Sequence, residues 1–288
     1  MSRLNINANC LGFEITDGDR LVALYRANEE LPRTESPKPC FAPIYTPGGK
    51  LITEYRPADH AWHTGLYFGW VHANDANLWG GPWYLPDKGK YEYVEKSHGV
   101  QRHIDWKSER VDAGGLRVEE HLQWLDPEDR SMANETRTYF FEKLNHVEGY
   151  KWVIDTSILP SVEKLVLGAS RAARYSGLEL RMGPPFADAH HRSSEGLEGH
   201  EAIMGQRARW VSAHGAIGGS VVMMDHPSNP RHPVTWFTRK NVLGAGLLME
   251  GDLEVGHGES LELRYGFLIF EEVPTDEEID AIYAEFAR

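Results

Sequence analysis

Two histidines stand three positions apart, just before a run of apolar residues typical of a strand. They are His60 and His63, within residues 59–65, and the apolar run covers residues 66–71. Successive side chains of a strand point to opposite faces, so the two imidazoles converge only if the backbone turns between them. Converging imidazoles could exchange protons with a substrate near neutral pH, or bind a metal ion. The structural alternative is that each histidine only hydrogen-bonds to loop backbone.

A second cluster combines histidines with prolines. Residues 225–233 read Asp-His-Pro-Ser-Asn-Pro-Arg-His-Pro, and Trp236 and Arg239 follow. Three prolines within seven positions restrict the backbone, so polar side chains on it lose little entropy on binding. We therefore expect His226 to act in acid–base or metal chemistry, and we expect substrate contacts from Asn229, Trp236 and Arg239. The alternative is a rigid turn between two strands, with the histidines satisfied by backbone carbonyls.

A third group consists of polar residues two apart in strand-like runs. Glu119 precedes His121, and Glu135 precedes Arg137. Residues two apart on a strand share a face, so each pair presents its groups in the same direction. Lining a concave sheet, Glu135 could serve as a base, and Arg137 and His121 could bind substrate together with Arg181. On a convex solvated face the same residues would be ordinary surface charges.

Tryptophans lie close to these clusters in the sequence. The chain has nine, and five of them are Trp62, Trp70, Trp79, Trp83 and Trp236. An indole ring can stack on the apolar face of a sugar while carboxylates and guanidinium groups bind its hydroxyls. We expect Trp79 to be such a substrate contact, although core packing explains any single tryptophan equally well.

Most of the chain alternates apolar and polar residues with a period of two, which indicates half-buried strands. Clear examples are residues 116–124, 152–158 and 261–269, with Gly, Pro, Asn and Asp between such runs. Many strands separated by turns predict an all-β fold, a large antiparallel β-sandwich.

The C-terminus is the exception to this pattern. Thr275 and Glu278 form a capping-box sequence, and apolar residues follow at helical spacing, so we expect one amphipathic helix there. Residues 183–205 are rich in Gly, Pro, His and Glu, and we interpret them as a long loop over one end of the sandwich, which could act as a lid carrying His190 and His191.

Composition narrows the classes of function. A chain of 288 residues can form a single sandwich domain, 1–288, and the formal charge of −13 disfavours nucleic acid as a partner. No apolar stretch is long enough for a membrane helix and no secretory pattern opens the chain, so we expect a cytoplasmic protein. Cys10 and Cys40 are too few for a disulfide framework.

Several segments together resemble one bacterial family. They are residues 57–70, 74–79, 134–138, 177–181 and 225–239, and they resemble the family labelled PmoA or DUF6807. The family's Asp-His-Pro-His-His motif matches Asp59, His60 and His63, but Ala61 and Trp62 replace the proline and the middle histidine. Its His-Pro-x-Asn-Pro signature is intact at residues 226–230. The resemblance implies a galactose-mutarotase-like supersandwich and a role in carbohydrate metabolism.

The leading functional hypothesis is an enzyme that transfers protons on a small sugar or an oxidised sugar, such as a mutarotase, epimerase or lyase. His60 or His63 would share acid and base roles with His226, with Glu135 as a further base, and Arg181 and Arg239 would orient hydroxyls or polarise a carbonyl. This hypothesis needs no cofactor.

Two other functions stay open. In a metal-assisted glycoside hydrolase or lyase, His60, His63 and His226 would hold a divalent metal ion. A sugar-binding module without turnover would depend on tryptophans and arginines instead. The sequence leaves open whether the chain forms a homo-oligomer.

Overall fold

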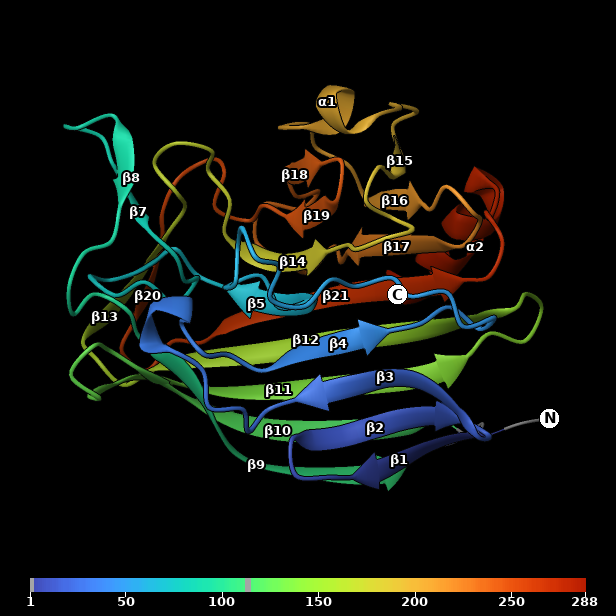
Figure 1. Cartoon of the computed structure of the whole chain (residues 1–288), viewed down its shortest axis with the longest axis horizontal. Helices are drawn as coiled ribbons and strands as arrows, with labels where there is room; N and C mark the ends of the chain where they lie inside the picture. The colour runs from blue at the N-terminus through green and yellow to red at the C-terminus, as the bar shows by residue number, and fades with distance from the viewer. Residues whose placement is uncertain (1–2, 112–114) are drawn as a thin grey trace.

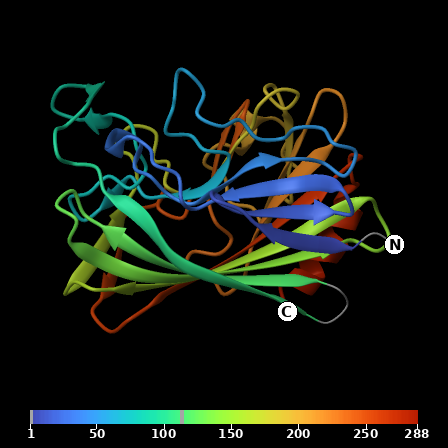
Figure 2. The same ribbon diagram turned by 60° about the horizontal axis from the view of Figure 1, so that its bottom comes forward.

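Two large antiparallel β-sheets pack face to face in the computed structural model, which describes residues 3–111 and 115–288. Figure 2 shows the strands near the N-terminus lying over the strands of the middle of the chain, so the two layers of the sandwich are seen on edge. The prediction of an all-β antiparallel sandwich is confirmed.

The first sheet has eight strands, in the order β1-β2-β3-β4-β5-β14-β19-β18 (Figure 1). Their bounds are Leu4–Ala8 (β1), Gly12–Asp17 (β2), Arg20–Arg26 (β3), Cys40–Ile44 (β4), Leu66–Gly69 (β5), Gly177–Arg181 (β14), Val242–Ala245 (β19) and Trp236–Arg239 (β18).

The second sheet also has eight strands, in the order β15-β16-β17-β21-β12-β11-β10-β9. Their bounds are His190–Ser193 (β15), Trp210–His214 (β16), Ser220–Asp225 (β17), Leu261–Phe270 (β21), Gly149–Pro160 (β12), Ser131–Lys143 (β11), Leu116–Leu125 (β10) and Val100–Arg110 (β9).

Smaller elements lie around the sandwich. A three-stranded sheet joins Leu253–Gly256 (β20), Lys164–Gly168 (β13) and His72–Ala73 (β6), and a hairpin joins Trp83–Leu85 (β7) to Lys90–Glu92 (β8). The helical segments are Arg33–Glu35 (η1), His200–Ile203 (α1) and Asp276–Phe286 (α2).

Alternation along the strands sends one set of side chains between the sheets. Phe41 on β4 lies 5.0 Å from the ring of Trp152 on β12, so aromatic residues of both sheets interdigitate there. Burying one such side chain contributes on the order of 2–3 kcal/mol, so this layer supplies most of the cohesion between the sheets.

The outer face of the second sheet is covered by the C-terminal helix. Ile279, Tyr283 and Phe286 of α2 pack on Met224 and Leu268 of β17 and β21. Thr275 accepts a hydrogen bond from the backbone N–H of Glu278, whose side chain accepts from the N–H of Thr275, so the predicted capping box and helix are confirmed.

The prediction of a long loop at residues 183–205 is wrong in part. This segment contains β15, which pairs with β16 at the edge of the second sheet, and it contains the short helix α1. His191 is fully buried beside His200, with 6.2 Å between the ring centroids, so β15 is part of the sandwich and not a lid. Period two over only four residues is too short to be distinguished from loop in the sequence.

Candidate functional site

A cavity of about 510 Å³ lies on the outer face of the first sheet, the face turned away from the second sheet. Its floor is made by β14, β19 and β18, and the loops around residues 60–63, 79–82 and 173–175 surround it, together with Tyr91 of the β7-β8 hairpin. A volume of this size accommodates a small organic ligand.

Alternation in β14 places two charged residues on the cavity floor. Leu178 and Leu180 point inward and join the core between the sheets, so Glu179 and Arg181 point outward into the cavity. On β18, Trp236 points inward by the same rule, and Phe237 and Arg239 face the cavity.

The loop before β5 brings the two predicted histidines together. The N–H of His63 donates to the carbonyl of His60 at 2.9 Å, a tight turn that places the two ring centroids 5.1 Å apart. Gly65 then leads into β5 with φ +81°, and a Cβ there would lie 2.3 Å from the carbonyl oxygen of Phe41, so only glycine fits. The expected turn at the start of the strand is confirmed.

A histidine and a carboxyl group meet at the cavity floor. His63 Nδ1 lies 3.6 Å from Glu179 Oε1, and the same oxygen accepts a hydrogen bond of 2.6 Å from the hydroxyl of Tyr67. His63 Nδ1 is itself buried and has no hydrogen-bond partner among the described residues. Both residues line the cavity, so a bound molecule could contact the imidazole ring and the carboxyl group together.

Burial shifts the pKa values of Glu179 and His63 in opposite directions. It raises the pKa of Glu179 to about 7, against the opposing effects of the Tyr67 hydroxyl and the cations Arg181 and Lys38. It lowers the pKa of His63 well below its ordinary value, and Arg181 and His60 lower it further. Near neutral pH the imidazole is therefore uncharged, and the carboxyl group can both release and accept a proton.

Lys38 holds two loops of the cavity together from below. Its buried ammonium donates hydrogen bonds to the carbonyls of Trp62 at 3.2 Å and Trp79 at 2.8 Å. It also lies 4.9 Å from the centre of the Tyr67 ring, and burial lowers its pKa to about 8. Lys38 thus anchors the backbone at both tryptophans and places a positive charge near Glu179.

Aromatic rings form the walls of the cavity. Trp62 packs on Gly80 and Gly81, where an added Cβ would come within 2.6 Å of the tryptophan side chain. Trp79 lies 4.8 Å from the ring of Tyr175. Flat apolar walls above a polar floor suit a ring that carries hydroxyls on its edge.

Five of the residues predicted from the sequence line this one cavity. They are His60, His63, Trp79, Arg181 and Arg239. His60 lies nearer the surface, where its Nδ1 contacts Asp59 at 2.8 Å.

Glu135 and Arg137 lie elsewhere, inside the sandwich. Arg137 Nε donates to Glu135 at 2.7 Å, and its guanidinium lies 4.7 Å from the centre of the Phe68 ring on the opposite sheet. Trp124 and Thr156 donate to the same carboxyl group at 2.8 and 2.6 Å. This position is inconsistent with the base role expected for Glu135 and the substrate role expected for Arg137, because both residues are buried between the sheets.

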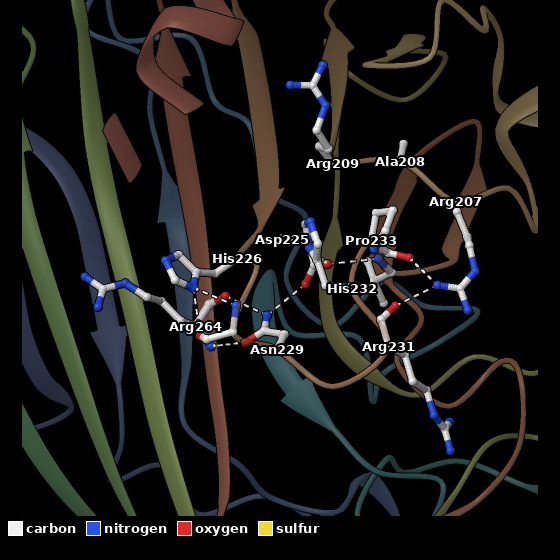
Figure 3. Close-up of polar contacts among 12 residues, drawn as sticks. Arg207, Ala208, Arg209, Asp225, His226, Asn229, Arg231, His232, Pro233 and Arg264 are labelled. Atoms are coloured by element: carbon white, nitrogen blue, oxygen red, sulfur yellow. Dashed lines mark hydrogen bonds and ion pairs between the residues drawn. The ribbon is translucent and has the colours of Figure 1, made fainter. Parts of the chain in front are cut away.

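The loop of residues 225–233 is a rigid connection between two strands, as the structural alternative supposed, and it leads from β17 of the second sheet to β18 of the first (Figure 3). Asp225 accepts hydrogen bonds from Asn229 at 2.8 Å and from the backbone N–H of Val234 at 2.8 Å, and it contacts His232 at 2.7 Å. The Asn229 side chain also accepts from the backbone N–H of Arg264 at 2.6 Å. Asn229 is therefore used within the loop and does not reach the cavity.

His226 lies on the opposite side of the molecule from His63. Its ring is 5.1 Å from that of Phe286 in α2, which covers the outer face of the second sheet, and its Nδ1 contacts Ser228 Oγ at 2.7 Å. The expectation that His226 shares a basin with His63 is therefore wrong, and so is the metal site built from His60, His63 and His226. Within residues 3–111 and 115–288, no group of three or more His, Cys, Asp or Glu side chains is arranged to hold a metal ion.

Two further candidates for substrate binding also lie outside the cavity. Trp236 is buried in the core, where its Nε1 donates to the carbonyl of Ala208 at 2.8 Å. His121 is on the solvent face of β10 and contacts Asp105 at 2.7 Å. Neither can touch a ligand bound at Glu179.

Glu179 is the main residue that the sequence interpretation missed. Residues 177–181 read Gly-Leu-Glu-Leu-Arg, so Glu179 and Arg181 share a face opposite to two leucines. The rule applied to Glu135 and Arg137 would also have identified this pair.

The fold and this cavity define the chain as an antiparallel β-sandwich protein with an aromatic-walled polar site on one outer face. The chain belongs to DUF6807, a family of unknown function, whose model matches residues 12–284. No curated protein matches the sequence. Among the helices of the described residues, none has the length and apolar character needed to span a bilayer.

Proposed function

We propose that this protein is a carbohydrate-active enzyme that transfers protons on a small sugar or oxidised sugar bound in the cavity beside Glu179. The observation that carries the proposal is the approach of His63 Nδ1 to Glu179 Oε1, 3.6 Å apart at the base of a cavity walled by Trp62 and Trp79. The proposed reaction class is that of a mutarotase, epimerase or lyase.

Opening of a sugar ring illustrates what the pair can do. A base removes the proton of the anomeric hydroxyl, C1–O1 becomes a carbonyl, and the ring C1–O5 bond breaks as an acid protonates O5. Glu179, with its pKa of about 7, is populated in both protonation states at neutral pH and suits either role. Uncharged His63 would accept or donate a hydrogen bond to the sugar according to its tautomer.

The remaining groups would bind and orient the sugar. Trp62 and Trp79 would stack on its apolar face, and the Arg181 guanidinium would bind hydroxyls or a carbonyl oxygen. Lys38 anchors the backbone that carries both tryptophans, which reduces the entropy lost when this part of the cavity binds a ligand.

NMR of purified protein with a panel of aldoses, 3-keto sugars and glycosides tests the proposal, because it detects both anomeric exchange and new products. For the sugar that is turned over, Glu179→Gln and His63→Gln should each lower the rate by a factor of about 10²–10⁴. Glu163→Gln, at an exposed position just before β13 and not among the residues that line the cavity, is the matched control and should leave the rate unchanged.

Two outcomes would count against an enzyme. If both cavity variants turn the sugar over as fast as wild type, the acid–base assignment is wrong. If sugars of the panel bind but none is converted, the chain is a sugar-binding module, in which aromatic stacking and arginines supply the affinity.

A further inference from the structure

Two arginines face the cavity from neighbouring positions of the first sheet. Arg181 on β14 is opposite Val242 on β19, and Val242 is opposite Arg239 on β18. All three line the cavity, so the arginines flank Val242 on one face, two strands apart, with roughly 10 Å between their Cα atoms.

The two guanidinium groups differ in their partners. Arg181 Nε donates to Glu54 at 3.2 Å, and its Nη2 lies 3.9 Å from Asp59, so carboxylates already balance this charge. Arg239 donates to the carbonyl of Thr238 at 3.1 Å and lies 4.9 Å from the centre of the Phe237 ring. Within the described part of the chain, no carboxylate pairs with Arg239.

The positive charge of Arg239 contrasts with the negative charge of the whole chain. The chain carries a formal charge of −13, which would repel an anion in general. The cavity, however, is lined by two guanidinium groups and by Glu179, whose raised pKa of about 7 reduces its negative charge at neutral pH. An anionic ligand would therefore find at Arg239 a cation that lacks an acidic partner.

From this we infer that the ligand is a sugar acid, a uronate or aldonate, whose carboxylate is bound by Arg239. The inference rests on the proposed function, since it names the class of sugar that the same site takes. A carboxylate fits one guanidinium through two parallel hydrogen bonds, so Arg239 alone is enough to bind it. A guanidinium also binds phosphate, and the 6-phosphate ligands of the test below separate the two anions.

Isothermal titration calorimetry with matched ligands tests the inference. The probes are D-galacturonate and D-glucuronate, the neutral hexoses D-galactose and D-glucose, and their 6-phosphates. We expect at least one uronate to bind ten-fold or more tightly than its matching hexose and its matching phosphate. Arg239→Gln should weaken uronate binding by roughly 10- to 100-fold while changing hexose binding little. Arg102→Gln, an exposed arginine on β9 of the other sheet, is the control and should bind as wild type does.

The outcomes separate this inference from the proposed function. Hexoses that bind as tightly as uronates overturn the sugar-acid inference and leave the proposed function standing. Tighter binding of the 6-phosphates overturns the choice of carboxylate, and a uronate preference that survives Arg239→Gln overturns the role of Arg239. If no sugar of any kind binds, both proposals fail.

Discussion

Two glutamate–arginine pairs with the same spacing have opposite environments in this molecule. On β11, Glu135 and Arg137 point into the space between the sheets and bond to each other at 2.7 Å. On β14, Glu179 and Arg181 point out of the sandwich into the cavity. No hydrogen bond or ion pair connects Glu179 to Arg181 in the described parts of the chain, and each has other partners.

The number of hydrogen-bond donors around each carboxyl group distinguishes a structural glutamate from one that is available for chemistry. Glu135 accepts hydrogen bonds from Arg137, Trp124 and Thr156, so it has little capacity left to bind another group. Glu179 is equally buried, but among residues 3–111 and 115–288 only the Tyr67 hydroxyl donates a hydrogen bond to it, and its pKa rises to about 7. A raised pKa in a residue that lines a cavity is the pattern expected at a functional site.

The largest expected effect is the loss of stability on breaking the ion pair between Glu135 and Arg137. Arg137→Met should lower the free energy of unfolding by about 3–5 kcal/mol, because it leaves Glu135 buried without its cation. Urea denaturation followed by tryptophan fluorescence measures this loss. The double variant Glu135→Leu/Arg137→Met should recover much of it, since both charges are then removed together.

Arg181→Met is the matched variant in the cavity. It should cost about 1 kcal/mol, because Glu54, the partner left behind, is 32 % exposed and keeps its hydration when the largely buried Arg181 is removed. Equal losses for Arg137→Met and Arg181→Met would remove the distinction between the two pairs.

The second prediction concerns Glu179 and the pH dependence of stability. Its pKa is raised from 4.5 to about 7 in the folded chain, so the folded state binds this proton more tightly than the unfolded state does. The contribution of Glu179 to stability therefore falls as the pH rises from about 4.5 through 7, by on the order of 2–4 kcal/mol in total. Glu179→Gln lacks this titration.

Urea denaturation of both proteins at pH 5 and pH 8 checks this linkage. Relative to wild type, Glu179→Gln should be more stable at pH 8 than at pH 5, by on the order of 2 kcal/mol. Glu163→Gln, with its exposed side chain, should show no such trend. A difference between Glu179→Gln and wild type that stays constant from pH 5 to pH 8 would show that Glu179 is not titrating in this interval.

Side chains alternate between the two faces of a strand, so odd and even positions (their parity) show how much of the direction of each glutamate–arginine pair the sequence could predict. In β11, Tyr139 and Phe141 have the parity of Glu135 and Arg137, so the apolar neighbours already indicate that this pair points inward. In β14 the leucines have the opposite parity to Glu179, which indicates an outward pair. The sandwich, the C-terminal helix and the turn between His60 and His63 followed from such local patterns, and all three are confirmed.

The position of the cavity does not follow from local patterns. It depends on which outer face the loops around residues 60–63 and 79–82 cross, and this is set by contacts such as Lys38 with the carbonyls of Trp62 and Trp79, 24 and 41 residues away. His226 illustrates the same limit, because its motif is clear in the sequence but α2 covers the face on which it lies. Sequence spacing gives the face of one strand, whereas the site is made by several distant segments.

The remaining predictions concern two single hydroxyl groups. Thr156 Oγ1 donates to Glu135 and the Tyr67 hydroxyl donates to Glu179, both at 2.6 Å, so Thr156→Val and Tyr67→Phe each remove one equivalent hydrogen bond. Thr156→Val should cost about 1.5–3 kcal/mol at both pH 6 and pH 9, because Glu135 stays paired with Arg137. Tyr67→Phe should cost less at pH 6, where Glu179 can hold a proton in place of the lost donor.

The sign of the Tyr67→Phe effect with pH follows from the pKa of Glu179. The tyrosine hydroxyl lowers that pKa, so its removal raises it further and disfavours the ionised form. The cost of Tyr67→Phe should therefore increase as the pH rises through about 7, while the cost of Thr156→Val stays constant. Urea denaturation of both variants at pH 6 and pH 9 distinguishes these trends. A cost of Tyr67→Phe that is the same at both pH values would mean that Glu179 does not exchange protons in this range.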